Sequence, residues 1–395
     1  MAKVYDTATD IITFARLQSQ NTTSGSSYLG SDGLLKFAAE DEPRIEYGSD
    51  GSLKGLLIEE QRTNLVMHSE DLNLFFTGQS GVSIEPAAAT EGPISAAQRM
   101  VADTSTGFHR AAGTALVQNS TDYTFSCFFK ADGQNVCGLS VYTGTSFAAR
   151  ASFDLSTVQE TVSNGSATIK SVGGGWYHCA VTGATTGTTA TVYIYVNSLF
   201  SATGDDTSGV FVYGAQLEAG SFPTSYIPTS GSEVTREPDI ASIPVSAFGY
   251  NQTAGTVVVE FDMLSDNADT LDLTQAAFGF HDGTSNNRLE LFSASAGVLT
   301  LRDRIAPVNH DAISSGNSLE QPTKSAASYA SGEASKLVVN GGSASVAATA
   351  TTPPAYSTLL LGDTQNVDAE LNGHIKSIKY YPRRLTDDQL VELTS

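Results

Sequence analysis

Three tyrosines stand at positions where they could bind a sugar. Tyr193 and Tyr195 alternate with aliphatic residues over 191–196, and Tyr142 has the same parity in the run 138–142. Side chains two residues apart on a β-strand point to the same face, about 7 Å apart, so the tyrosines face outward if the aliphatic residues face a core. Aromatic rings with hydroxyl tips suit sugar rings. We therefore predict glycan binding at these tyrosines, with burial in an interdomain or subunit contact as the alternative.

The sequence contains no arrangement of residues that indicates a catalyst. None of the six histidines has a partner at metal-ligand spacing, and no nucleophile elbow is present. Carboxylates are abundant, but a glycosidase pair depends on a separation in space that sequence does not give. We expect a protein that is not an enzyme.

A calcium site is the one metal site that the sequence suggests. Asp205 and Asp206, together with Asp154, could supply the oxygen ligands that Ca²⁺ prefers. The alternative is a solvated turn over 204–209, which we favour because aspartate is common in turns. We therefore expect no cofactor and no metal.

The segment 55–65 places charged and amide side chains directly after an apolar run at 56–58. Such a run is typical of a strand buried on both faces, and the polar groups can tie loops together by charge-assisted hydrogen bonds. Trp176, the single tryptophan, follows three glycines, and an indole there is more often packed against a sheet than offered to a ligand. We interpret all of these as structural residues. The polar members of the set are Glu59, Glu60, Arg62 and Asn64.

Composition limits the fold class and the partners. The 395 residues include 42 acidic and 21 basic side chains, a net charge of −21. Nucleic acids and anionic membranes would be repelled, so a neutral or cationic partner is favoured. The low charged fraction and the short alternating runs are typical of all-β proteins. Three cysteines, an odd number, argue against a disulfide framework.

Turn residues and alternation divide the chain into three regions. The region 1–70 has short apolar runs and little periodicity, which favours a docking arm or small β-module. The regions 71–238 and 239–395 each predict an antiparallel β-sandwich. We expect one short helix over 386–394, with a threonine N-cap. The Ser- and Ala-rich stretch 302–334 is expected to be a surface loop.

Four separated pieces of the N-terminal region stand in order. They are ITFAR at 12–16, DGLL at 32–35, EPR at 42–44 and GLLIEEQRTNL at 55–65. This order resembles the N-terminal motif of many tailed-phage appendage proteins. Separated pieces in a fixed order are a more specific signal than any single piece.

Two further resemblances cover most of the remaining chain. The middle region resembles the carbohydrate-binding-module type of jelly roll, and the C-terminal region resembles a laminin-G or concanavalin-like sandwich. The first rests on FDLS at 153–156, GGWYHC at 174–179, GAQLEAG at 214–220 and PTSYIP at 223–228. The second rests on VNG at 339–341, LGD at 361–363 and the segment 371–385.

The resemblances imply a bacteriophage virion structural protein that attaches to the host surface, usually to glycan, as a tail fibre or receptor-binding protein. They further imply a homotrimer that contacts other virion proteins through its N-terminal region. The alternative is a capsid head fibre or decoration (cement) protein without a receptor. A capsule depolymerase ranks third, because no β-helical repeat is present. With no secretory signal or membrane span, we expect synthesis in the host cytoplasm, location on the virion surface and no membrane insertion.

Overall fold

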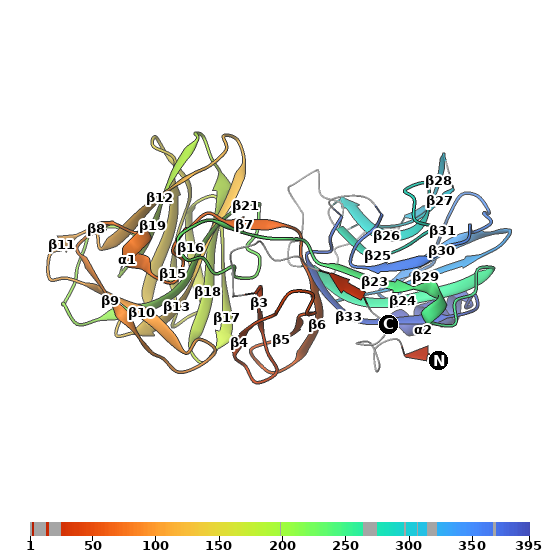
Figure 1. Ribbon diagram of the computed structural model, residues 1–395, viewed down its shortest axis with the longest axis horizontal. Helices are drawn as coiled ribbons and strands as arrows, with labels where there is room; N and C mark the ends of the chain where they lie inside the picture. Colours follow the sequence, from red (N-terminus) through yellow and green to blue (C-terminus); the bar gives the residue numbers. More distant parts are fainter. Residues whose placement is uncertain are drawn as a thin grey trace.

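Two β-sandwiches lie side by side along the long axis of the molecule, and the segment from β3 (Ser27–Leu29) to β7 (Arg62–Asn64) runs between them (Figure 1). This computed structural model confirms the all-β expectation. It describes residues 2–3, 13–15, 25–197, 199–263, 275–295, 298–305, 307–313, 322–365 and 369–395.

The first sandwich consists of two six-stranded antiparallel sheets. One has the order β17 (Ser166–Gly173), β18 (Trp176–Ala184), β13 (Asp122–Asp132), β21 (Gly209–Ala219), β10 (Ala96–Ala102) and β9 (Val82–Ala89). The other has the order β16 (Gln159–Asn164), β15 (Phe147–Asp154), β14 (Val136–Tyr142), β19 (Thr189–Val196), β12 (Arg110–Leu116) and β8 (Gly78–Ser80). The two alternating runs noted in the sequence, 138–142 and 191–196, lie on β14 and β19.

Alternation along the strands explains the core of the first sandwich. On β19, Val192 and Ile194 are fully buried, and on β15 the same is true of Ala151 and Phe153. All four belong to one apolar cluster between the two sheets. Because side chains alternate across a strand, the residues between them face the outside of the sandwich.

The second sandwich contains an eight-stranded and a seven-stranded sheet. The first has the order β31 (Ser345–Val346), β30 (Glu333–Val339), β29 (Thr323–Ala330), β24 (Ala254–Met263), β33 (Gly373–Tyr381), β6 (Leu53–Ile58) and β5 (Ile45–Tyr47), and β1 (Ala2–Lys3) also pairs with β33. The second has the order β2 (Thr13–Ala15), β23 (Ile240–Pro244), β32 (Thr358–Leu361), β25 (Gln275–His281), β26 (Asn287–Ser295), β27 (Val298–Ile305) and β28 (Val308–Ile313).

Most of the described strands of the N-terminal region 1–70 belong to the sheets of the second sandwich, which differs from the expected separate arm. Strands β1, β5 and β6 extend one sheet of the second sandwich, and β2 extends the other. The apolar run at 56–58 is buried on β6, with Leu56 and Ile58 in the core of that sandwich. Strand β7 then pairs with β22 (Val234–Arg236). Of the ITFAR motif, residues 12 and 16 lie outside the described residues.

The stretch 302–334 is also different from the expected loop, because its described residues include β28 and β29. Strand β29 is almost entirely buried, although Ser325, Ala326, Ala327 and Ser328 are small. Small side chains let neighbouring elements approach closely, so this strand is central in its sheet in spite of its low hydrophobicity.

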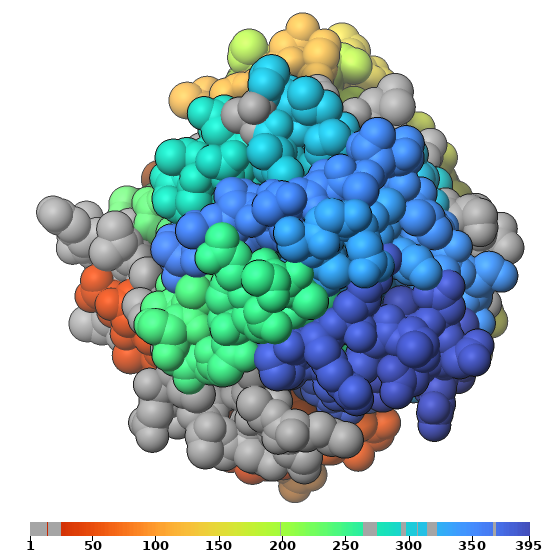
Figure 2. Space-filling model, turned by 90° about the vertical axis from the view of Figure 1, so that its right-hand side faces the viewer, coloured from red at the N-terminus to blue at the C-terminus, as the bar shows by residue number. Residues whose placement is uncertain are grey.

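The predicted C-terminal helix is confirmed as α2 (Asp387–Thr394). The Thr386 hydroxyl accepts a hydrogen bond from the Gln389 N–H, and the Gln389 side chain accepts one from the Thr386 N–H. This capping box satisfies donors at the helix start. Figure 2 shows the chain end beside the segment near residue 250, and the Asn251 amide donates to the Pro382 carbonyl there.

The smaller elements complete the description of the chain. They are α1 (Leu72–Phe75), a 3₁₀ turn at Val245–Ala247, the hairpin of β3 with β4 (Leu35–Phe37), and the pair β11 (Thr106–Gly107) and β20 (Ala202–Thr203). Within the described ranges, neither α-helix has the length and apolar character needed to cross a membrane.

Candidate functional site

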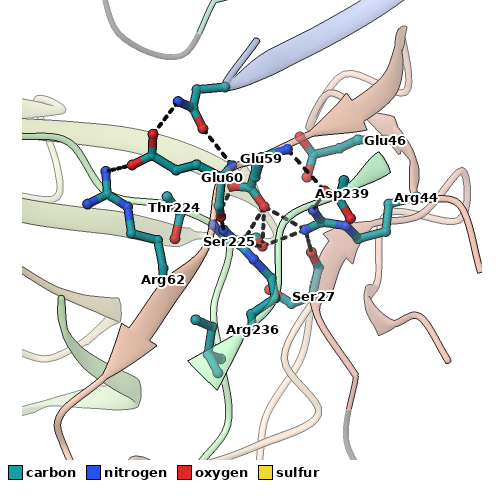
Figure 3. Close-up of polar contacts among 12 residues, drawn as sticks. Ser27, Arg44, Glu46, Glu59, Glu60, Arg62, Thr224, Ser225, Arg236 and Asp239 are labelled. Atoms are coloured by element: carbon teal, nitrogen blue, oxygen red, sulfur yellow. Dashed lines mark hydrogen bonds and ion pairs between the residues drawn. The ribbon is translucent and has the colours of Figure 1, made fainter. Parts of the chain in front are cut away.

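A buried ionic cluster lies where the two sandwiches meet (Figure 3). Glu59, which follows β6, accepts contacts from Arg44 at 2.7 Å and from Arg236 at 2.5 Å. A second guanidinium nitrogen of Arg44 contacts the Asp239 carboxylate. All four side chains are almost completely excluded from solvent. The cluster therefore joins the N-terminal segment to the segment that connects the two sandwiches.

Hydrogen bonds from the loop after β21 complete the cluster. The Ser225 N–H and hydroxyl donate to the Glu59 carboxylate at 2.8 and 2.6 Å, and the Arg44 guanidinium also donates to the Ser27 carbonyl at 3.2 Å. Burial alone raises the pKa of Glu59, but the charges of Arg236 and Arg44 and the serine hydrogen bonds lower it to about 2. Glu59 is thus ionised at neutral pH.

The three other polar residues predicted as structural lie next to this cluster. Glu60 pairs with Arg62 at 2.6 Å and accepts from the Asn372 amide of the second sandwich at 2.8 Å. Arg62 lies over the Phe222 ring, 4.9 Å from its centroid. Asn64 donates to the Ile227 carbonyl and accepts from the N–H groups of Val66 and Leu217. Segment 55–65 therefore contacts both sandwiches.

Gly220 makes room for this contact. Its φ of +138° is unfavourable for other residues, and a Cβ there would lie 1.6 Å from a guanidinium nitrogen of Arg62. The GAQLEAG piece at 214–220 therefore ends in glycine because an arginine from a distant part of the chain occupies the space.

Removal of the charge on Glu59 should destabilise the protein strongly. The Glu59→Gln substitution leaves two buried guanidinium groups with too few partners, and we expect the free energy of unfolding to fall by about 3–5 kcal/mol. Glu85→Gln is the matched control, because Glu85 pairs with Arg99 at 3.3 Å on the surface; there we expect a loss below about 1 kcal/mol. Urea unfolding followed by fluorescence measures both. Equal losses in the two variants would contradict the structural role of the cluster.

A second charged group joins the N-terminal segment to the second sandwich. The His374 ring lies between two carboxylates, with Nδ1 at 2.6 Å from Asp262 and Nε2 at 2.7 Å from Glu46. Burial opposes a charge on the ring, but the two carboxylates outweigh it and raise the pKa of His374 to about 9. The pKa values of Asp262 and Glu46 are lowered in return. Sequence reasoning missed this group because Glu46 and His374 are 328 residues apart in the chain.

The His374 contact predicts a loss of stability in alkali. Because the folded-state pKa of about 9 is above the ordinary value of 6.5, the stabilisation is complete below pH 6.5 and is lost as the pH rises through 9. We expect the unfolding temperature of the wild type to fall more between pH 6 and pH 10 than that of His374→Ala. His310→Ala serves as a control, because His310 contacts a threonine hydroxyl rather than a carboxylate. Parallel pH curves for the wild type and His374→Ala would exclude this role.

A cleft of about 880 Å³ lies between the N-terminal strands and the first sandwich, with Tyr47 and Lys170 among its lining residues. His178, on its wall, packs against Phe128 with the two rings tilted and their centroids 4.6 Å apart. Burial and the nearby Lys170 lower the pKa of His178 to about 4. The ring is therefore neutral and packed near neutral pH, which does not suit a proton-transfer role.

The outer face of the sheet β15–β14–β19–β12 carries the three predicted ligand-binding tyrosines. Tyr193 and Tyr142 are half-buried, and the rings of Tyr193 and Tyr195 have centroids 5.9 Å apart. The predicted exposure of Tyr195 is wrong, because its side chain is completely buried. The segment after β19 turns back across this face, and Leu199 fills the space beside Gly138. Tyr195 therefore packs beneath this segment and is not accessible to a ligand.

Two arginines that sequence reasoning did not select stand on the same face. The guanidinium carbon of Arg110 lies 4.4 Å from the ring centroid of Tyr193 and 4.8 Å from that of Phe108. Arg150 lies 4.6 Å from the Phe147 ring centroid. The sequence does contain a signal for Arg110, because this residue begins an alternating run over 110–116 in which the residues that face the core are small. The arrangement offers cations and aromatic rings together.

The remaining predicted positions have structural surroundings. Trp176 is fully buried and donates to the Glu91 carbonyl at 3.1 Å. Asp205 accepts from the N–H groups of Thr207 and Ser208 within its own turn, and Asp154 accepts from Ser156 in the same way. In the part of the chain that the structure describes, no three His, Cys, Asp or Glu side chains are grouped as metal ligands would be.

Comparisons with known proteins give only distant similarities. No protein-family model and no curated protein matches the chain. The carbohydrate-binding module CBM40 of the Ruminococcus gnavus IT-sialidase, bound to α2,3-sialyllactose, is similar with 20% identity over 37% of this chain and 84% of that one, at a TM-score of 0.30. Domains LG4-5 of the mouse laminin α1 chain are 12% identical over 72% of this chain and 88% of theirs, at a TM-score of 0.28. At such low TM-scores, nothing about the ligand of this chain follows.

Proposed function

We propose that the protein is displayed on the surface of a bacteriophage particle and attaches to glycan on the host cell envelope, as a tail fibre or receptor-binding protein. The observation that carries the glycan part is the outer face around Tyr193. There, half-buried Tyr193 and Tyr142 and exposed Phe108 lie on or beside a rigid sheet. Rigid aromatic rings flanked by polar groups are the surface that sugar binding requires.

The virion part of the proposal rests on the four ordered pieces of the N-terminal region. Two of them supply the ionic cluster, since Arg44 belongs to EPR and Glu59 to GLLIEEQRTNL. Such a junction suits a protein that must hold two sandwiches in a fixed relation outside a cell. Single sugar contacts are weak, so useful affinity would come from several copies acting together, as in the expected homotrimer.

Loss of the Tyr193 ring should weaken glycan binding. Aromatic contacts contribute about 0.5–1.5 kcal/mol beyond the area they bury, so we expect Tyr193→Ala to lower the affinity for host envelope polysaccharide by about threefold to tenfold. Tyr47→Ala is the control, because Tyr47 is also half-buried but lines the cleft. Biolayer interferometry with the full chain measures both. If Tyr47→Ala lost binding and Tyr193→Ala did not, the glycan site would lie in the cleft instead.

The position of the protein on the particle tests the attachment role. We expect gold-labelled antibody against this chain to mark the tail or the tail tip in electron micrographs, and to block adsorption of the phage to its host. Label confined to the capsid, with adsorption unaffected, would favour a head fibre or decoration protein. Absence of label from intact particles would contradict the virion proposal.

A further inference from the structure

We infer that the outer face around Arg110 binds a saccharide that bears an anionic group, a carboxylate or a phosphate. This inference rests on the proposed glycan attachment and names the chemical class of the ligand. It departs from the neutral or cationic partner that the net charge of −21 favours, because the charges on this face have the opposite sign to the chain as a whole.

Arg110 is a cation with no anionic partner in the described structure. Its guanidinium contacts the rings of Tyr193 and Phe108, and it forms no hydrogen bond or ion pair with any described residue. Most described arginines differ in this respect, since each of the following contacts a carboxylate: Arg44, Arg62, Arg99, Arg236, Arg288, Arg302 and Arg384. In a chain with twice as many acids as bases, an unpaired arginine held by two rings is unusual.

Arg150 provides a second cation and fixes the border of the face. Its guanidinium lies 5.0 Å from the Phe200 ring centroid and 5.8 Å from that of Tyr195, and it donates to the Leu199 carbonyl. Its Nε is buried without a hydrogen-bond partner in the described structure. Arg150 is therefore a positioning residue that holds the segment after β19 over Tyr195.

The positions between and around the two arginines are neutral. Strand register places Tyr195 opposite Arg110, and Ser140 between Tyr193 and Arg150. The outward-facing residues that lie nearest to the two arginines are small or hydroxylated: Ala112, Thr114, Ser140, Ser152 and Thr191. The acidic Asp154 lies at the far end of β15, four residues from Arg150, and accepts hydrogen bonds within its own turn. An anion at this face thus meets two cations and no nearby strand carboxylate. Charges elsewhere on the chain are screened beyond about 8–10 Å at moderate salt.

The chemistry of the groups selects an anionic sugar over a free anion or a neutral sugar. A guanidinium binds a carboxylate or a phosphate through two parallel hydrogen bonds, while the faces of Tyr193 and Phe108 accept the C–H groups of a sugar ring. A neutral sugar would use the rings and leave Arg110 without a partner. A small anion would use Arg110 and leave the rings uncovered.

An array of immobilised saccharides tests the inference with the full-length protein. The array holds neutral, uronate-bearing and phosphate-bearing oligosaccharides, together with the methyl esters of the uronates, which keep the sugar ring and remove the charge. We expect binding to uronate-bearing or phosphate-bearing probes, and a loss of at least about tenfold on esterification. The uronate and phosphate probes distinguish the two anionic groups.

Arg110 variants connect the result to this face. We expect Arg110→Gln to lower the affinity for the bound anionic probe by about 10- to 100-fold, and Arg110→Lys to lose less because it keeps the charge. Arg304→Gln is the matched control, since Arg304 contacts an asparagine on the second sandwich. Circular dichroism verifies that each variant is folded. The wild-type ester comparison needs no variant at all.

The outcomes separate the two proposals. Binding of uronates and their esters with equal affinity, or an unchanged affinity in Arg110→Gln, would overturn the anionic ligand while glycan attachment stands. Binding of neutral probes alone would do the same. No binding to any saccharide on the array, combined with no binding to host envelope polysaccharide, would overturn glycan attachment itself.

Discussion

The structure depends on one buried carboxylate, Glu59, which meets two guanidinium groups at the junction of the sandwiches. Removing charges from water costs several kcal/mol for each ion, and the cost is offset only where every charge has good partners. Here Asp239, Ser225 and the Ser27 carbonyl supply further partners for these charges. The cluster therefore specifies one arrangement of three segments, because any other arrangement would leave a buried charge unpaired.

Arginine has two different roles in this protein, and the groups that surround each guanidinium decide which role it has. Arg44 is buried between carboxylates and holds the junction. Arg110 lies between aromatic rings at a solvent-facing sheet and has no carboxylate among the described residues. A paired guanidinium has its charge satisfied within the fold, whereas an unpaired one keeps its hydrogen-bonding capacity for a ligand. The contrast links the stability of the junction to the proposed attachment face.

Sequence reasoning failed where burial did not follow hydrophobicity. Strand β29 is buried although it is rich in serine and alanine, because small residues fill the narrow space between packed elements. Tyr195 has the alternation of an outward residue and does face outward, but the segment with Leu199 covers it. Region 1–70 has weak periodicity because its short strands complete sheets that other parts of the chain begin.

The sequence by itself determined the alternating strands at 138–142 and 191–196, the buried run at 56–58 and the threonine N-cap of α2. These features depend on alternation and on residues a few positions apart, and such local patterns are visible in the sequence. Only the tertiary structure decided which charges meet: Arg44 and Asp239 are 195 residues apart, and Glu46 and His374 are 328 apart. Coulomb interactions act through space rather than along the chain, so ion pairs and unpaired cations become visible only once the sheets are assembled.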